Sequence, residues 1–151
     1  MIHPIIESWR INQRTNLQLL SLIPEDHLED RYGKRTRSVA RTFAHMHHVR
    51  LQWLGAVGLD QEDGLEKLGR KEGNEITVLK QHLERSAEVM EQMLSLAIEK
   101  GKISGFKGTP TAFLSYLIAH EAHHRGQIIV SLRVNGHLLG SEGIHSLWDW
   151  D

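Results

Sequence analysis

The sequence contains no cysteine among its 151 residues. Disulfide bonds, thiolate metal ligands and a cysteine nucleophile are therefore excluded. It also lacks an uninterrupted apolar run near the ~18–20 residues that a helix needs to cross a bilayer. Residues 1–10 lack the charged-then-apolar layout of a signal peptide. We therefore expect a cytoplasmic protein without a membrane partner.

Neither sign of charge is in large excess, because 18 lysines and arginines stand against 19 aspartates and glutamates, a formal net charge of -1. No global attraction toward an acidic polymer or surface follows, and we expect no nucleic-acid partner. The length suits one domain with its own core, so we predict a single domain over residues 1–151. The one compositional anomaly is the presence of 11 histidines.

Strand patterns are missing as well, and apolar residues instead recur at helical spacing in four long segments. These lie at about residues 5–23, 36–57, 77–100 and 110–135. Pro24 ends the first segment, while Thr109 and Pro110 are typical of a helix start and Gly136 of a position just past a helix end. We expect irregular chain after Gly136, with at least one of Trp148 and Trp150 docked on the protein. The pattern predicts an all-α fold, an antiparallel four-helix bundle.

Two histidines, His120 and His124, stand one turn apart in the last long segment. They share a face with Phe113, Leu117 and Ile128, so both point toward the expected core. Burying two imidazoles costs free energy unless each ring finds a partner, and a divalent metal is a suitable partner for two neutral rings. The alternatives are core histidines bonded to backbone carbonyls, or an exposed patch.

A tightly bound divalent ion needs a third protein ligand, and the second segment offers His45, His47 and His48. The apolar pattern alone favours His47, which lies at the edge of the apolar face. Around the pair, Glu121 and Gln127 are candidates for orienting a ring N–H. Arg125 is expected to pair with a carboxylate or, alternatively, to bind an anionic group of a substrate. A glycine inside a helix, as at Gly126, suggests a close helix crossing.

Two other metal sites fit the sequence poorly. Residues 120–124 match H-E-x-x-H, a zinc-protease motif in which the glutamate is the general base. The extended motif would need glycine at Gln127 and histidine at Val130, and no downstream glutamate helix or substrate-binding edge strand is evident. Di-iron bundles need E-x-x-H pairs on the helices, which are also missing.

Three stretches together resemble the DinB-like superfamily of metal-binding four-helix bundles. They are Phe43–Met46 followed by Gln52–Leu54, then His120–Ile128 (HEAHHRGQI), and the terminal Leu147–Trp150. The resemblance implies a metal site between the second and fourth helices, with His45, His120 and His124 as ligands. It therefore replaces His47 by His45 as the third ligand, while His47, His48 and His123 are extra histidines that compete for that role.

The resemblance also implies a homodimer and a small-molecule substrate. Related branches include thiol-dependent isomerases and S-transferases, and others are described as metal-dependent hydrolases. We therefore expect one divalent metal, Zn or Ni ahead of Fe or Mn, that acidifies a bound water or thiol. Without cysteine, any thiol must be a low-molecular-weight co-substrate. The alternative is a non-catalytic stress-response or binding module with a structural or sensed metal.

Overall fold

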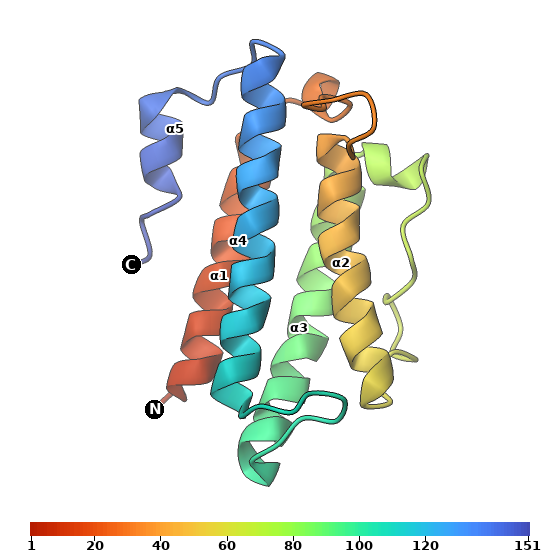
Figure 1. Cartoon of the computed structure of the whole chain (residues 1–151), viewed down its shortest axis with the longest axis vertical. Helices are drawn as coiled ribbons and strands as arrows, with labels where there is room; N and C mark the ends of the chain where they lie inside the picture. The colour runs from red at the N-terminus through yellow and green to blue at the C-terminus, as the bar shows by residue number, and fades with distance from the viewer.

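The computed structural model describes residues 1–151, and its regular structure is helical, with no strand. Five α-helices and two short 3-10 helices follow one another along the chain (Figure 1). They are α1 (Pro4–Ser21), η1 (Glu25–His27), α2 (Val39–Ala56), η2 (Glu72–Asn74), α3 (Ile76–Lys100), α4 (Pro110–Val134) and α5 (Gly140–Ser146). No helix is long and apolar enough to span a membrane.

Local sequence signals set the ends of the long helices. The hydroxyl of Thr109 accepts a hydrogen bond from the Ala112 N–H at 3.1 Å, and Pro110 is the first residue of α4. Ser38 caps α2 in the same way by accepting from the Arg41 N–H at 3.2 Å. Gly101 ends α3 in the left-handed conformation, with φ 69°. The four predicted helices are confirmed to within a few residues.

The directions of the helices differ from a simple up-and-down bundle. In Figure 1, α1 and α4 run one way and α2 and α3 run the other, because the segment of residues 57–75 returns along α2 before α3 begins. Helix α2 packs against α3 and α4, and α1 also packs against α3 and α4. The predicted antiparallel arrangement is therefore corrected: α2 and α4 are antiparallel neighbours, but α2 and α3 are parallel. A connection of this length can cross the whole bundle, which the apolar pattern of the helices does not reveal.

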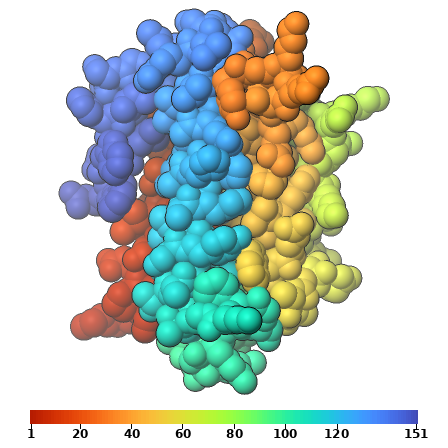
Figure 2. Space-filling view, viewed as in Figure 1, coloured from red at the N-terminus to blue at the C-terminus, as the bar shows by residue number.

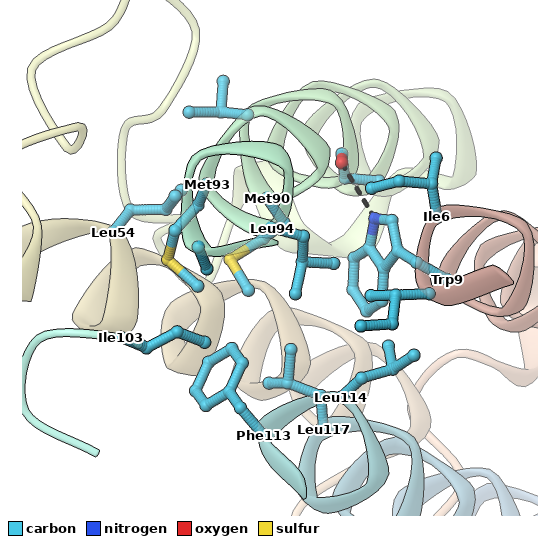
Figure 3. Close-up of a cluster of buried hydrophobic side chains, with 14 of the residues drawn as sticks. Ile6, Trp9, Leu54, Met90, Met93, Leu94, Ile103, Phe113, Leu114 and Leu117 are labelled. Atoms are coloured by element: carbon cyan, nitrogen blue, oxygen red, sulfur yellow. Dashed lines mark hydrogen bonds between the residues drawn. The ribbon is translucent and has the colours of Figure 1, made fainter. Parts of the chain in front are cut away.

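The core consists of two apolar clusters, one at each end of the bundle. One cluster, shown in Figure 3, gathers Trp9, Leu54, Met90, Phe113 and Leu117 with their neighbours. The indole N–H of Trp9 donates to the Ala87 carbonyl at 3.0 Å, which satisfies its one polar atom. The other cluster is built around Leu19, Phe43, Leu79, Ile128 and Leu132. Their separation leaves the middle of the bundle to polar side chains.

Arg50 of α2 forms the centre of this middle layer and is fully buried. Its Nε and Nη2 donate to the two carboxylate oxygens of Glu121, at 2.6 and 3.0 Å. The remaining N–H groups donate to Gln13 Oε1, the Leu83 carbonyl and Ser86 Oγ, at 2.8–3.1 Å. All five donors of the guanidinium are thus used, and the group also lies 4.9 Å from the ring centroid of Trp9.

Glu121 of α4 is equally well satisfied. The side-chain amides of Asn12 and Asn16 on α1 each donate to its Oε2 at 2.7 Å. Burial opposes ionisation of this carboxyl, but the charge of Arg50 and these hydrogen bonds outweigh it and hold the pKa of Glu121 below its usual value. Arg125 donates to the amide oxygens of Asn12 and Asn16, at 2.8 and 2.6 Å. It therefore pairs with Glu121 indirectly, through the two asparagines.

The end of the chain departs from the prediction of an irregular tail. Residues 140–146 form α5, which lies beside α1 (Figure 1) and is tied to it by a hydrogen bond from Gln18 to Ser146. The docked apolar side chain is Leu147, whereas Trp148 and Trp150 are 72% and 50% exposed. The two indole rings stack on each other instead of being buried in the bundle, and Trp150 reaches α1 through its carbonyl, which accepts from Arg14 at 2.8 Å.

Replacing Arg50 by Met should lower the free energy of unfolding by about 3–5 kcal/mol, because Glu121 is left as an uncompensated buried charge. Urea unfolding followed by circular dichroism measures this loss. The double variant Arg50→Met/Glu121→Met should recover part of it, since the unpaired charge is gone although Asn12 and Asn16 have lost their acceptor.

The matched control for this prediction is Arg85→Met. Arg85 also carries ion pairs, to Glu62 and Glu88, but it lies at the surface. Loss of the Arg85 side chain should lower the free energy of unfolding by no more than about 1 kcal/mol. Equal costs for the Arg50 and Arg85 variants would contradict the special role of the buried pair.

Candidate metal centre

The structure brings His45, His120 and His124 together. One nitrogen of each ring belongs to a group whose members all lie within 4.8 Å of one another. The Nε2 atoms of His120 and His124 are 3.0 Å apart, close to the roughly 3.0–3.4 Å between two nitrogens that share a zinc ion at bond lengths of about 2.0–2.1 Å. His45 faces this pair from α2, with its ring centroid 4.7 Å from that of His124.

Gln127 selects the tautomer of His124. Its Oε1 lies 2.8 Å from His124 Nδ1, and because an amide oxygen only accepts, that nitrogen carries the proton. Nε2 of His124 then carries the lone pair, which is directed at Nε2 of His120. Orientation of a ligating imidazole by a hydrogen bond to its other nitrogen is the usual arrangement in metal sites.

The electrostatics keep all three rings neutral at pH 7, which is the form that binds metal. Burial, followed by the nearby charge of Arg37, lowers the pKa of His45 to about 4. Burial is also the main cause that lowers the pKa of His120 and of His124. His120 and His45 are only half-buried, so the cluster has a side open to solvent.

The buried ion pair explains why these three residues meet. Glu121 stands between His120 and His124 in the sequence, and its bond to Arg50 fixes the rotation of α4 against α2. Because α2 and α4 are antiparallel, moving from Arg50 toward the start of α2 corresponds to moving from Glu121 toward the end of α4. His45 therefore lies opposite His124.

The histidines that were considered as competing ligands, His47 and His48 of α2 and His123 of α4, face elsewhere. His47 is fully buried, but its Nε2 lies 2.8 Å from the carbonyl of Glu66, in the segment of residues 57–75. His48 Nε2 accepts from the Leu68 N–H at 2.9 Å. His123 is exposed on the outer surface of α4. None of the three belongs to the group of converging nitrogens, so the pattern-based choice of His47 is not supported.

Glu121 does not orient an imidazole, since its oxygens bond to Arg50, Asn12 and Asn16. Those contacts also leave it unsuited to act as a general base, which removes the structural basis for the zinc-protease interpretation. The sequence contained a signal that Glu121 is a buried structural residue. Glu121 follows Leu117 by four residues and precedes Ile128 by seven, so it occupies the apolar stripe itself.

The three histidines have the properties of a site for one divalent ion. They offer neutral nitrogens from two rigid helices, and their spacing suits a shared ion. Nδ1 of His120 is buried and has no hydrogen-bond partner. A cluster of this kind can hold a metal; which metal it prefers depends on chemistry that imidazole ligands alone do not specify.

Comparison with known families assigns the chain to one of them. The family model described as DinB family matches residues 2–141, and the chain belongs to that family. No curated protein and no solved structure matches the chain.

Gly126, between the candidate ligand His124 and Gln127, does not mark a close helix crossing. A Cβ at this position would have no atom within 4 Å, and the backbone is helical. The predicted packing reason is therefore wrong, and the glycine only weakens the helix.

Replacing Gly126 by Ala should raise the free energy of unfolding by about 0.5–1 kcal/mol, because alanine loses less conformational entropy in a helix. The matched control is Gly101→Ala, which also has free space but a left-handed backbone, and this change should destabilise the protein. Thermal and urea unfolding measure both. A destabilised Gly126→Ala variant would show that the position has a role in packing after all.

Proposed function

We propose that this member of the DinB family binds one divalent transition metal through His45, His120 and His124, and that it is an enzyme whose catalysis depends on this metal. The observation that carries the proposal is the convergence of the three imidazole nitrogens within 4.8 Å. Zn²⁺ and Ni²⁺ are the first candidates, followed by Fe²⁺ and Mn²⁺. The homodimer implied by the family resemblance stays a prediction, to be measured as the mass of the protein in solution.

Catalysis is favoured over a structural role because the cluster is accessible. A structural zinc site is typically closed by four protein ligands, whereas a catalytic site uses three and keeps one position open. Here three histidines converge, and two of them are only half-buried. A metal bound at such a site acidifies a water or thiol that binds to it. The proposed reactions are hydrolysis, or transfer of a low-molecular-weight thiol to an electrophile.

The protein supplies positioning rather than proton transfer around this site. Gln127 holds the His124 ring in one tautomer, and the Arg50–Glu121 pair keeps the histidines opposite each other. Glu121, the carboxylate next to His120 in the sequence, uses both oxygens on Arg50, Asn12 and Asn16. Because Glu121 is not free to transfer a proton, the second candidate is a binding module that senses or stores metal without turnover.

Elemental mass spectrometry of protein purified without a histidine tag should find about one equivalent of transition metal. His120→Ala and His124→Ala should each abolish stoichiometric binding, and His45→Ala should do nearly as much, because two imidazoles hold a divalent ion weakly. His47→Ala is the control within the same helix and should keep the metal. Loss of metal in the His47 variant with retention in the His45 variant would restore the alternative ligand.

Gln127→Ala should weaken metal binding by about 10–100-fold, because the ring of His124 loses the acceptor that orients it. Gln127→Glu keeps an oxygen at that place and should preserve affinity. Gln81→Ala changes an exposed glutamine and is the neutral control. Competition with a chromogenic chelator measures all three, and an unchanged affinity in Gln127→Ala would remove this residue from the site.

Activity separates the two candidate functions. Metal-loaded protein is tested with activated esters and, in parallel, with small thiols and an electrophile such as a chloronitrobenzene. Turnover lost in His120→Ala supports the enzyme. Metal binding without turnover of any of these substrates, together with a large loss of thermal stability on chelation, would favour the binding module.

A further inference from the structure

Arginine side chains gather around a pocket at the end of the bundle where α2 begins. The pocket has a volume of about 410 Å³ and no hydrophobic lining residue. Five of its lining residues are Arg31, Arg35, Arg37, Arg41 and Arg70, and the only acidic one is Glu29. Such a local excess of positive charge is notable in a chain whose formal net charge is -1. The volume is in the range of small-molecule sites.

Most of these guanidinium groups are free to bind a ligand. Arg35, Arg37 and Arg70 are exposed, and none of them is part of an ion pair or hydrogen bond within the chain. Glu29 neutralises only Arg31, at 3.8 Å. Arg41 uses part of its fork on the carbonyls of the segment of residues 57–75. Like charges placed this close repel one another, so an anion in the pocket would relieve the repulsion.

The backbone contributes little to the pocket, which makes the arginines decisive. Ser38 lines it and caps α2, but the first N–H groups of that helix are already bonded. The Val39 N–H donates to the Asp30 carbonyl and the Ala40 N–H to the Leu28 carbonyl, at 2.8 and 2.9 Å. The Arg41 N–H donates to Ser38. Recognition must come from guanidinium forks, which fit carboxylate and phosphate oxygens in pairs.

A second pocket lies between this one and Gln127, the hydrogen-bond partner of His124. It has a volume of about 420 Å³ and shares Arg35, Thr36 and Arg37 with the arginine pocket. Its other side is lined by Gln127, whose Oε1 accepts from His124. In Figure 2 the upper part of α2 and the segment before it border α4 on the face turned to the viewer. The two pockets are therefore neighbours across Arg35, Thr36 and Arg37, and the second one reaches the residue that holds a candidate metal ligand.

From this arrangement we infer that the arginine pocket binds the anionic end of the substrate, a phosphate monoester or polycarboxylate group, while the substrate's other end reaches the histidine cluster. The part of the inference that places the other end of the substrate at the histidines rests on the proposed function, but the anion site itself does not need a metal. Arg35, Arg37 and Arg70 are the residues assigned to bind the anion. The helical pattern does not show that these three arginines converge, because they lie in two connections far apart in the sequence.

The test is isothermal titration of metal-free protein with inorganic phosphate, pyrophosphate and the tricarboxylate tricarballylate, at constant ionic strength set by chloride. We expect saturable binding at one site per chain. The variant Arg35→Gln/Arg37→Gln/Arg70→Gln should bind at least about tenfold more weakly. Its thermal stability should not fall, because these side chains have no partner in the protein.

The matched control is Lys100→Gln/Lys102→Gln/Lys107→Gln, which removes the same charge from exposed positions at the opposite end of the bundle. It should bind the anions like the unmodified protein. Equal weakening in the two triple variants, or no saturable binding of any of the three anions, would overturn the inference. Preference for pyrophosphate or phosphate identifies a phosphate ester as the source of the anion, and preference for tricarballylate identifies a polycarboxylate.

Two variants separate this inference from the metal proposal. His120→Ala should keep the anion site, and the triple arginine variant should keep its metal content. Nuclear magnetic resonance of the metal-free protein should show that the anion shifts the side-chain amide of Gln127, as expected if a bound anion is felt in the neighbouring pocket that Gln127 lines. Anion binding that leaves Gln127 unchanged would overturn the connection to the histidines, whatever the metal content proves to be.

Discussion

The buried pair of Arg50 and Glu121 is the interaction on which the rest of the structure depends. Desolvating two charges is expensive, and it is tolerated here because every donor of Arg50 and both oxygens of Glu121 have partners. Those partners come from all four long helices. Apolar side chains would pack these helices in several rotations at similar cost, whereas this network is satisfied in one. It therefore sets how α2 and α4 face each other.

The candidate site uses that fixed rotation. Helix α4 alternates two tasks within one turn, with Glu121 turned into the polar layer and His120 and His124 turned toward α2. Gln127, one turn further on, then holds His124 in the tautomer that leaves Nε2 free. The arginine pocket lies just beyond, where the chain enters α2. The charged pair that holds the helices together is thus buried in the centre of the bundle, while the arginines assigned to ligand binding lie at the end of the bundle where α2 begins.

Much of the helical structure was accessible from local patterns, because caps, prolines and apolar spacing act over a few residues. Thr109 with Pro110 marked the start of α4, and the spacing of His120 and His124 identified the pair. The direction of α3 was not accessible, because the glycine-rich segment of residues 57–75 carries no signal for where it ends in space. The tail was also misjudged, since its buried side chain is Leu147 and not a tryptophan.

By itself the sequence determined an all-helical chain with a histidine pair one turn apart, and it supplied the motifs that resemble the DinB-like superfamily. The first follows from periodicity and spacing, which are local, and the resemblance rests on the particular residues of those motifs. The apolar pattern favoured His47 and the resemblance named His45, and it is the tertiary structure that brings His45 to the pair. The structural role of Glu121 and the gathering of Arg35, Arg37 and Arg70 were decided only by the tertiary structure. Each depends on which helix or connection lies opposite, and that is settled by how buried charges and amides find partners across the whole bundle.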